Sequence, residues 1–210
     1  MHRLADGIVQ LDTADARVMA WKNGGGTTRE LAVFPPDAAL TGKPFLWRVS
    51  IAEVGRDGPF SPFPGYDRSI MLIEGAGMQL DMQDAVPVRL TERFKPLRFS
   101  GDADTQCALL DGPVRDFNVM TARAQLTHHC DIIRGGAMQA RWTPASETLF
   151  AHCLCDSLIV KLRDMDEIVL HAGQSLVFDS RDSGCDARAL LLAPGSPASV
   201  AVLVTLREPG

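Results

Sequence analysis

The sequence predicts an all-β protein, and three observations support this prediction. Most apolar stretches have the length of a β-strand and alternate polar with apolar residues, which is the two-residue period of a strand. Glycine, proline and acidic residues separate these stretches at short, regular intervals. Almost no stretch has the period of an amphipathic helix. This combination is typical of β-sandwiches and barrels.

Strand-length runs fill both halves of the chain. The first half has two short strands within 8–21, followed by runs at 27–34, 45–54, 69–74, 78–82, 86–90, 94–99, 106–110 and 116–120. The second half has runs at 125–133, 138–142, 148–155, 157–162, 168–171, 175–178, 187–193 and 200–206. Because no flexible linker separates the halves, we expect two jelly-roll-like barrels packed together, at residues 1–125 and 126–210.

A run of three glycines lies in the stretch 21–31, WKNGGGTTREL. Glycine tolerates positive φ and allows the backbone to approach other groups closely. Gly24 and Gly25, with Trp21 and Asn23 before them, form either a tight turn or a loop whose N–H groups hold an anion. The loop is not a nucleotide-binding P-loop, because its spacing differs and no helical pattern follows it.

The strand predicted at 45–54 carries an unusual polar face. Trp47 shares one face with other large apolar residues, and that face must pack between layers. Arg48 and Ser50 therefore project to the opposite side, and if that side is the barrel interior, the guanidinium of Arg48 is buried there. A buried guanidinium needs a partner. The candidates are the carboxylate of Glu30, as an internal salt bridge, and a bound anion.

Aromatic residues lie on a stiff loop at 58–68, GPFSPFPGYDR. Its three prolines resist both helix and central strand. Phe60 and Phe63 either plug the end of a barrel or form the wall of a pocket, since binding pockets are mainly apolar with a few convergent polar groups.

Polar side chains of the first half make up the candidate site. The planar donor fork of arginine suits carboxylates. We therefore expect a small carboxylate ligand whose apolar part is covered by aromatic rings. The predicted ligand-binding residues are Trp21, Asn23, Gly24, Gly25, Glu30, Arg48, Ser50, Phe60, Phe63, Arg68 and Asn118.

Composition excludes some classes of protein. The net charge of −5 and a pI near 5.5 argue against a general nucleic-acid binder. No apolar run reaches membrane-spanning length, and the first residues lack the apolar core of a signal peptide. The five cysteines are irregularly spaced, which favours reduced thiols in the cytoplasm over a disulfide framework.

Metal ligands are sparse in the first half, which has no histidine between His2 and His128. In the second half, His152, Cys153 and Cys155 offer imidazole and thiolate ligands for zinc. Apolar neighbours make a buried core position the better interpretation for these cysteines. We expect no metal and no cofactor.

Several segments together resemble the HutD/Ves family, whose members are bicupin proteins associated with bacterial histidine utilisation. The matching segments are 21–31, 45–53, 58–68, 74–75 and 112–123. The resemblance implies a bicupin fold and a regulatory, ligand-binding role, with ligands such as urocanate or formylglutamate. Cupin enzymes typically use two histidines one residue apart to hold a metal, whereas the comparable strand here offers Arg48 and Ser50.

Two other functions stay open. One is a metal-free cupin enzyme, an isomerase or hydrolase, with Glu30 as the base and Arg48 polarising a carbonyl. The other is an interaction protein that uses an exposed sheet edge to form a homodimer or to bind a regulator.

Overall fold

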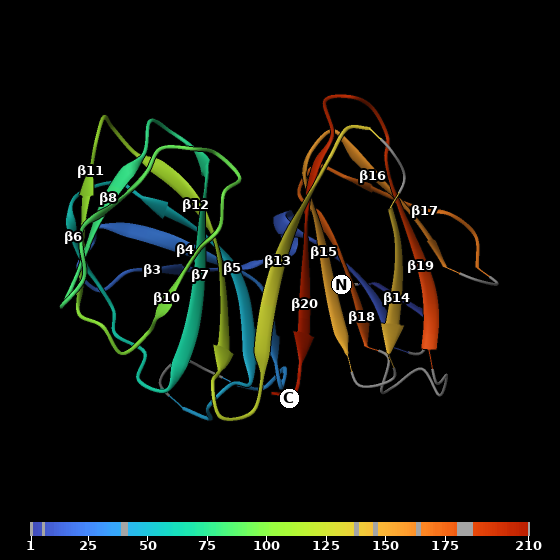
Figure 1. Ribbon diagram of the computed structural model, residues 1–210, viewed down its shortest axis with the longest axis horizontal. Helices are drawn as coiled ribbons and strands as arrows, with labels where there is room; N and C mark the ends of the chain where they lie inside the picture. Colours follow the sequence, from blue (N-terminus) through green and yellow to red (C-terminus); the bar gives the residue numbers. More distant parts are fainter. Residues whose placement is uncertain are drawn as a thin grey trace. The chain divides into compact units, whose positions relative to one another are not determined.

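The computed structural model describes residues 2–5, 7–38, 42–136, 139–144, 147–162, 165–179 and 187–209, without the side chains of 139–144 and 187–189. The chain forms two compact units (Figure 1). One unit is Ala16–Thr127, and the other combines Met1–Asp15 with His128–Gly210. The first fifteen residues therefore belong to the second unit, which differs from the expected division at 1–125 and 126–210.

The unit Ala16–Thr127 consists of ten antiparallel strands among the described residues. They are β3 (Arg17–Ala20), β4 (Gly26–Phe34), β5 (Trp47–Val54), β6 (Gly58–Phe60), β7 (Tyr66–Glu74), β8 (Met78–Met82), β9 (Val88–Leu90), β10 (Leu97–Ser100), β11 (Thr105–Leu109) and β12 (Val114–Ala122). One sheet has the order β10-β7-β12-β5-β4-β3, and the other has the order β6-β11-β8-β9.

The second unit repeats this plan of a six-stranded and a four-stranded sheet. Its strands are β1 (His2–Ala5), β2 (Ile8–Asp12), β13 (Thr127–Arg134), β14 (Gln139–Pro144), β15 (Thr148–Cys155), β16 (Ser157–Leu162), β17 (Ile168–His171), β18 (Gln174–Asp179), β19 (Ala187–Pro194) and β20 (Val200–Arg207), with a 3-10 turn at Thr13–Asp15. The sheet orders are β1-β2-β18-β15-β20-β13 and β14-β19-β16-β17. Strand β2 pairs with β18, and this pairing assigns the N-terminal residues to this unit.

The all-β prediction is confirmed, and the strands form face-to-face pairs of sheets. In the unit Ala16–Thr127, buried residues from both sheets form one apolar cluster, which includes Val54, Ile70, Leu72, Met78, Leu80, Phe99 and Val114. The hydrogen-bonded order of each described sheet is open, so these are two-sheet sandwiches and not continuous barrels. We call the space between the two sheets of this unit its lumen.

Strand register places the predicted polar residues on one side of the large sheet. Residues directly opposite each other in an antiparallel pair project to the same face. Val54, which shares a face of β5 with Arg48 and Ser50, belongs to the apolar cluster between the sheets, so this face is lumenal. The relevant pairs are Glu30–Ser50, Ser50–Asn118, Arg48–Met120 and Met120–Arg68.

The glycine run leads into β4, which begins at Gly26, and the local backbone requires two of the three glycines. Gly24 has a φ of +67°, which side chains rarely allow. A Cβ on Gly26 would lie 2.2 Å from the carbonyl oxygen of Glu53, so only glycine lets β4 approach β5 this closely. Local backbone geometry therefore accounts for Gly24, through its positive φ, and for Gly26, through the close approach of two strands.

Within the part of the chain that the structure describes, no helix has the length and apolar character needed to cross a membrane.

Candidate functional site

The structure brings five of the predicted residues together in the lumen and adds a sixth. We call this group the lumenal polar cluster, and its members are Glu30, Arg48, Ser50, Arg68, Asp116 and Asn118. All but Glu30 are buried to more than nine-tenths. Two cations and two carboxylates inside an apolar sandwich are unusual, because buried charge is costly unless it is paired.

Arg48 and Glu30 form an ion pair across β5 and β4. The Nε of Arg48 donates to Oε2 of Glu30 at 2.7 Å, with Arg48 5% exposed and Glu30 13% exposed. Of the two partners expected for Arg48, the structure therefore contains the carboxylate. The pair does not use the whole guanidinium, because the buried Nη2 of Arg48 has no hydrogen-bond partner among the described residues.

Arg68 is surrounded by aromatic rings. Its guanidinium carbon lies 5.8 Å from the ring centre of Phe60, 5.4 Å from that of Phe63 and 4.9 Å from that of Phe99. Such cation–π contacts stabilise a charge that has lost its water. Burial lowers the pKa of Arg68 to about 10, and the charge of Asp116 opposes this shift, so the side chain stays cationic at neutral pH.

Only part of the Arg68 guanidinium is hydrogen-bonded. Nη1 donates to the carbonyl oxygen of Ser61 at 3.3 Å, which is a long bond. The buried Nε has no partner within the described residues. Arg68 thus resembles Arg48 in presenting an unused N–H group inside the lumen.

Asp116 and Asn118 supply unused acceptors. The amide Nδ2 of Asn118 donates to Oδ1 of Asp116. Oδ2 of Asp116 and Oδ1 of Asn118 are buried without hydrogen-bond partners in the described part of the chain. Burial raises the pKa of Asp116 to about 7, against the opposing effects of the Asn118 hydrogen bond and the Arg68 charge.

Four unpaired polar atoms in one buried cluster form a pattern of donors and acceptors. Buried side-chain polar atoms in native proteins nearly always have a partner. The two N–H groups of Arg48 and Arg68 suit a carboxylate, and the oxygens of Asp116 and Asn118 suit a donor group. The cluster therefore has the chemistry to hold a small molecule that carries a carboxylate and a hydrogen-bond donor.

The sequence analysis missed Asp116 of this cluster and also Phe99, whose ring packs against Arg68, and only Asp116 leaves a signal in the sequence. Asp116 stands two residues before Asn118 in a strand, so alternation places both on the same face. Phe99 pairs with Arg68 in the β10–β7 register, which sequence alone does not reveal.

Trp21 also reaches the lumen. Its ring meets that of Phe60 edge-on, with ring centres 6.1 Å apart, and it packs against the apolar cluster. The indole Nε1 donates to Oγ1 of Thr28 at 2.8 Å. Trp21 therefore forms part of the wall of the lumen, and its indole N–H is already engaged by Thr28 of β4.

The glycine loop itself lies elsewhere. Gly24 and Gly25 line a hollow of about 580 Å³ whose other lining residues include Arg56 and Arg115, and no member of the lumenal polar cluster lines it. Oδ1 of Asn23 accepts from the Gly25 N–H at 2.9 Å, so Asn23 closes the turn. The predicted set is therefore divided between two places.

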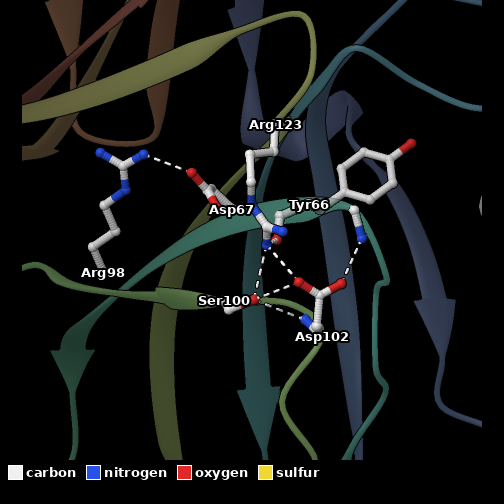
Figure 2. A network of polar contacts seen from close by, with 7 residues as sticks. Tyr66, Asp67, Arg98, Ser100, Asp102 and Arg123 are labelled. Atoms are coloured by element: carbon white, nitrogen blue, oxygen red, sulfur yellow. Dashed lines mark hydrogen bonds and ion pairs between the residues drawn. The ribbon is translucent and has the colours of Figure 1, made fainter.

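A network of polar contacts on the surface joins Asp67, Asp102 and Arg123 (Figure 2). Arg123 contacts Asp67 at 2.6 Å and Asp102 at 2.7 Å, while Oδ1 of Asp102 accepts from the Gly65 N–H at 2.7 Å. These bonds tie the end of the loop carrying Phe63 to the turn between β10 and β11. The Gly65 N–H, then Ser100 and Arg123, lower the pKa of Asp102 to about 2.

The second unit holds the histidine and cysteine residues considered as zinc ligands. His152 is buried, and its Nδ1 lies 2.7 Å from Oγ of Ser175. Burial raises the pKa of the Cys153 thiol to about 11, which makes it an inert core residue. Among the described residues, no three His, Cys, Asp or Glu side chains are grouped as metal ligands.

No disulfide involves the four cysteines that the structure describes. Cys185 lies outside the described residues.

Curated relatives match part of the chain. An uncharacterised 21.2 kDa protein in the hutC 3′ region of Pseudomonas putida is 42% identical over 104 residues, which are 50% of this chain and 53% of the relative. The protein Ves of Citrobacter koseri is 40% identical over 107 residues, with the same coverage. The chain thus spans about half the length of the curated relatives it matches.

Solved structures match the whole fold. A conserved protein of unknown function from Pseudomonas aeruginosa is 32% identical, with a TM-score of 0.83. The match covers 97% of this chain and 100% of that protein. HutD from Pseudomonas fluorescens is 30% identical, with a TM-score of 0.78 and the same coverage.

A cupin 2 barrel protein from Leptotrichia buccalis is 8% identical, with a TM-score of 0.56 over 91% of this chain and 96% of that protein, which shows a cupin fold. The bicupin prediction is therefore confirmed. The sequence pattern of the HutD family matches residues 13–193. This chain belongs to the HutD family.

Proposed function

We propose that the unit Ala16–Thr127 binds a small carboxylate in its lumen, held by Arg48 and Arg68. The observation that carries this proposal is the pair of buried, unpaired N–H groups on two neighbouring cations. A carboxylate supplies two acceptor oxygens and a negative charge, and charge-assisted hydrogen bonds are the strong ones. Glu30 compensates only one of the two arginines.

The apolar and acceptor groups around the arginines define the rest of the ligand. The rings of Phe60, Phe63 and Trp21 suit an apolar portion, as in most small-molecule sites. Oδ1 of Asn118 is available for an N–H group of the ligand. Urocanate and formylglutamate each combine a carboxylate with an N–H group, so they are our candidate ligands.

The biological role we propose is regulation of histidine utilisation by a ligand from that pathway. It is supported by family membership and by a relative named for its place in a hutC region. The alternative of a metal-free enzyme would use Glu30 as its base, and this carboxylate accepts a hydrogen bond from Arg48.

Calorimetric titration tests the binding proposal. The wild type, Arg48→Lys and the exposed control Arg89→Ala are titrated with urocanate, formylglutamate and N-formylglycine. Loss of a charge-assisted contact costs about 1.5–3 kcal/mol, so Arg48→Lys is expected to weaken binding by roughly tenfold or more. Lysine keeps the charge but lacks the second donor of the fork. Equal binding by all three proteins would refute the role of Arg48, and no binding of any compound would refute the proposed function.

A further inference from the structure

Asp116 is a buried acid that the carboxylate contacts leave unused. It lies on β12, where it pairs with Ala52 of β5 and Leu72 of β7. The ionisable groups around it in the lumen are Glu30 from β4, Arg48 from β5, Arg68 from β7 and Cys107 from β11. The strands β6, β8, β9 and β10 face the lumen with apolar side chains, namely Phe60, Met78, Leu80, Leu90 and Phe99.

The charges in this lumen balance before any ligand enters. Arg48 and Arg68 contribute two positive charges, and Glu30 and an ionised Asp116 contribute two negative ones. A ligand carboxylate adds a third negative charge in a space shielded from water. A buried charge without compensation is expensive, and proteins usually avoid it by changing a protonation state.

We propose that Asp116 takes up one proton when the carboxylate binds, so that the lumen accepts the anion and a proton together. This inference rests on the proposed function. The proton from solvent forms an O–H bond on Oδ2 of Asp116, which is the unpaired oxygen. Oδ1 continues to accept from Asn118, and the new O–H group can donate to the ligand.

Protonation of Asp116 therefore restores charge balance and also gives its unpaired oxygen a partner. Glu30 is less suited to this role, because it forms an ion pair with the cation of Arg48, whereas Asp116 accepts its hydrogen bond from the neutral amide of Asn118. The burial that raises the pKa of Asp116 to about 7 places its titration in the neutral range. Cys107 does not compete, since burial raises the pKa of its thiol to about 12.

The direction of the pH effect follows from linkage. Below about pH 7 the free protein already carries the proton, so binding takes up little and affinity is highest. Above about pH 7 binding takes up close to one proton, and affinity falls by about tenfold per pH unit. The effect ends where the bound protein also loses the proton.

Calorimetry in two buffers with different ionisation enthalpies counts this proton. The probe is N-formylglycine, which carries a single carboxylate and has no group that titrates near neutral pH. For the wild type we expect uptake approaching one proton at about pH 8 and clearly less at about pH 6. Asp116→Asn mimics the protonated acid, so its binding should take up no proton and should not vary with pH. Asp81→Asn, which changes an exposed acid of the same unit, should behave as the wild type.

The outcomes separate the two proposals. Binding without proton uptake at about pH 8 in the wild type overturns this inference and leaves the proposed function standing. Absence of binding overturns both. The wild-type proton count can overturn the inference even if Asp116→Asn does not fold. Uptake that persists in a folded Asp116→Asn would assign the proton to another group and refute the role of Asp116.

Discussion

Arg48 donates its Nε hydrogen to Glu30 at 2.7 Å, and the same guanidinium holds a buried Nη2 that has no hydrogen-bond partner among the described residues. The ion pair explains how the charge of Arg48 is tolerated inside a sandwich. It also means that Glu30 competes electrostatically with any anion that approaches Arg48. A ligand site and a structural salt bridge therefore share one side chain.

Replacing Glu30 by Gln should separate these two roles. The change removes a negative charge next to Arg48 but keeps an oxygen that can accept the Nε hydrogen. We expect the free energy of unfolding to fall by about 1–3 kcal/mol, as for a lost charged hydrogen bond. Affinity for carboxylates should rise, since the anion no longer faces a like charge. Urea unfolding and calorimetric titration measure the two effects, and weaker binding with a stable fold would contradict this account.

Arg68→Met should uncouple stability from binding. Methionine suits the space among Phe60, Phe63 and Phe99, and an apolar group avoids the cost of a buried charge. We expect a melting temperature equal to or above that of the wild type, together with at least about tenfold weaker carboxylate binding. Thermal melts and titration of the same preparation test this. A large loss of stability would indicate that the cation itself holds the loop.

Asp102→Asn should remove a stabilising effect that depends on pH. The pKa of Asp102 is lowered to about 2 in the folded protein, so its ionised form favours folding. This contribution is complete above the ordinary pKa of 3.8 and disappears as the pH falls towards 2. The wild type should therefore melt at a higher temperature than Asp102→Asn near neutral pH, and the difference should shrink in acid. A difference that stays constant down to about pH 2.5 would contradict the assigned pKa direction.

Asp116→Asn should have the opposite pH signature in the protein without ligand. The pKa of Asp116 is raised to about 7, so ionising it opposes folding. Wild-type stability should decline relative to Asp116→Asn as the pH rises from about 4 to about 7, and the difference should then level off. Denaturant unfolding at a series of pH values provides the comparison, with Asp81→Asn as the exposed control.

Gly26→Ala should destabilise the unit much more than Gly55→Ala. A Cβ on Gly26 would lie 2.2 Å from the Glu53 carbonyl oxygen, whereas one on Gly55 would have its nearest contact at 3.5 Å. Only the first change forces β4 away from β5. We expect a loss of about 2–3 kcal/mol for Gly26→Ala and a small effect for Gly55→Ala, measured by urea unfolding.

The alternation of side chains along each strand predicted which residues of the lumenal site share a face. The polar face of β5 follows from Trp47 and its apolar neighbours, and the same rule would have added Asp116. The Glu30–Arg48 pair depends on the β4–β5 register, which shifts between Glu30 and Ala32. Such a shift is a property of the assembled sheet, so the two partners of Arg48 remained open alternatives.

The glycine loop shows the opposite case, in which a conspicuous motif has a local cause. Gly26 is required by close approach to β5, and Asn23 by the turn that Gly25 completes. Neither requirement involves the arginines. The glycine run is conspicuous in the sequence, and the prediction therefore placed it in one site with the arginines. In the structure, Gly24 and Gly25 line a different hollow.

The pairing of β2 with β18 determines the order in which the protein can fold during synthesis. Ile8 pairs with Phe178, so β2 leaves the ribosome long before its partner exists. The unit Ala16–Thr127 has all its strands available first, and domains generally fold as they are completed. The apolar Ile8 therefore stays unpaired until β18 has been made, while the unit Ala16–Thr127, which lies between β2 and β18 in the sequence, can already fold. The unit that combines Met1–Asp15 with His128–Gly210 can therefore be completed only after its C-terminal strands have been made.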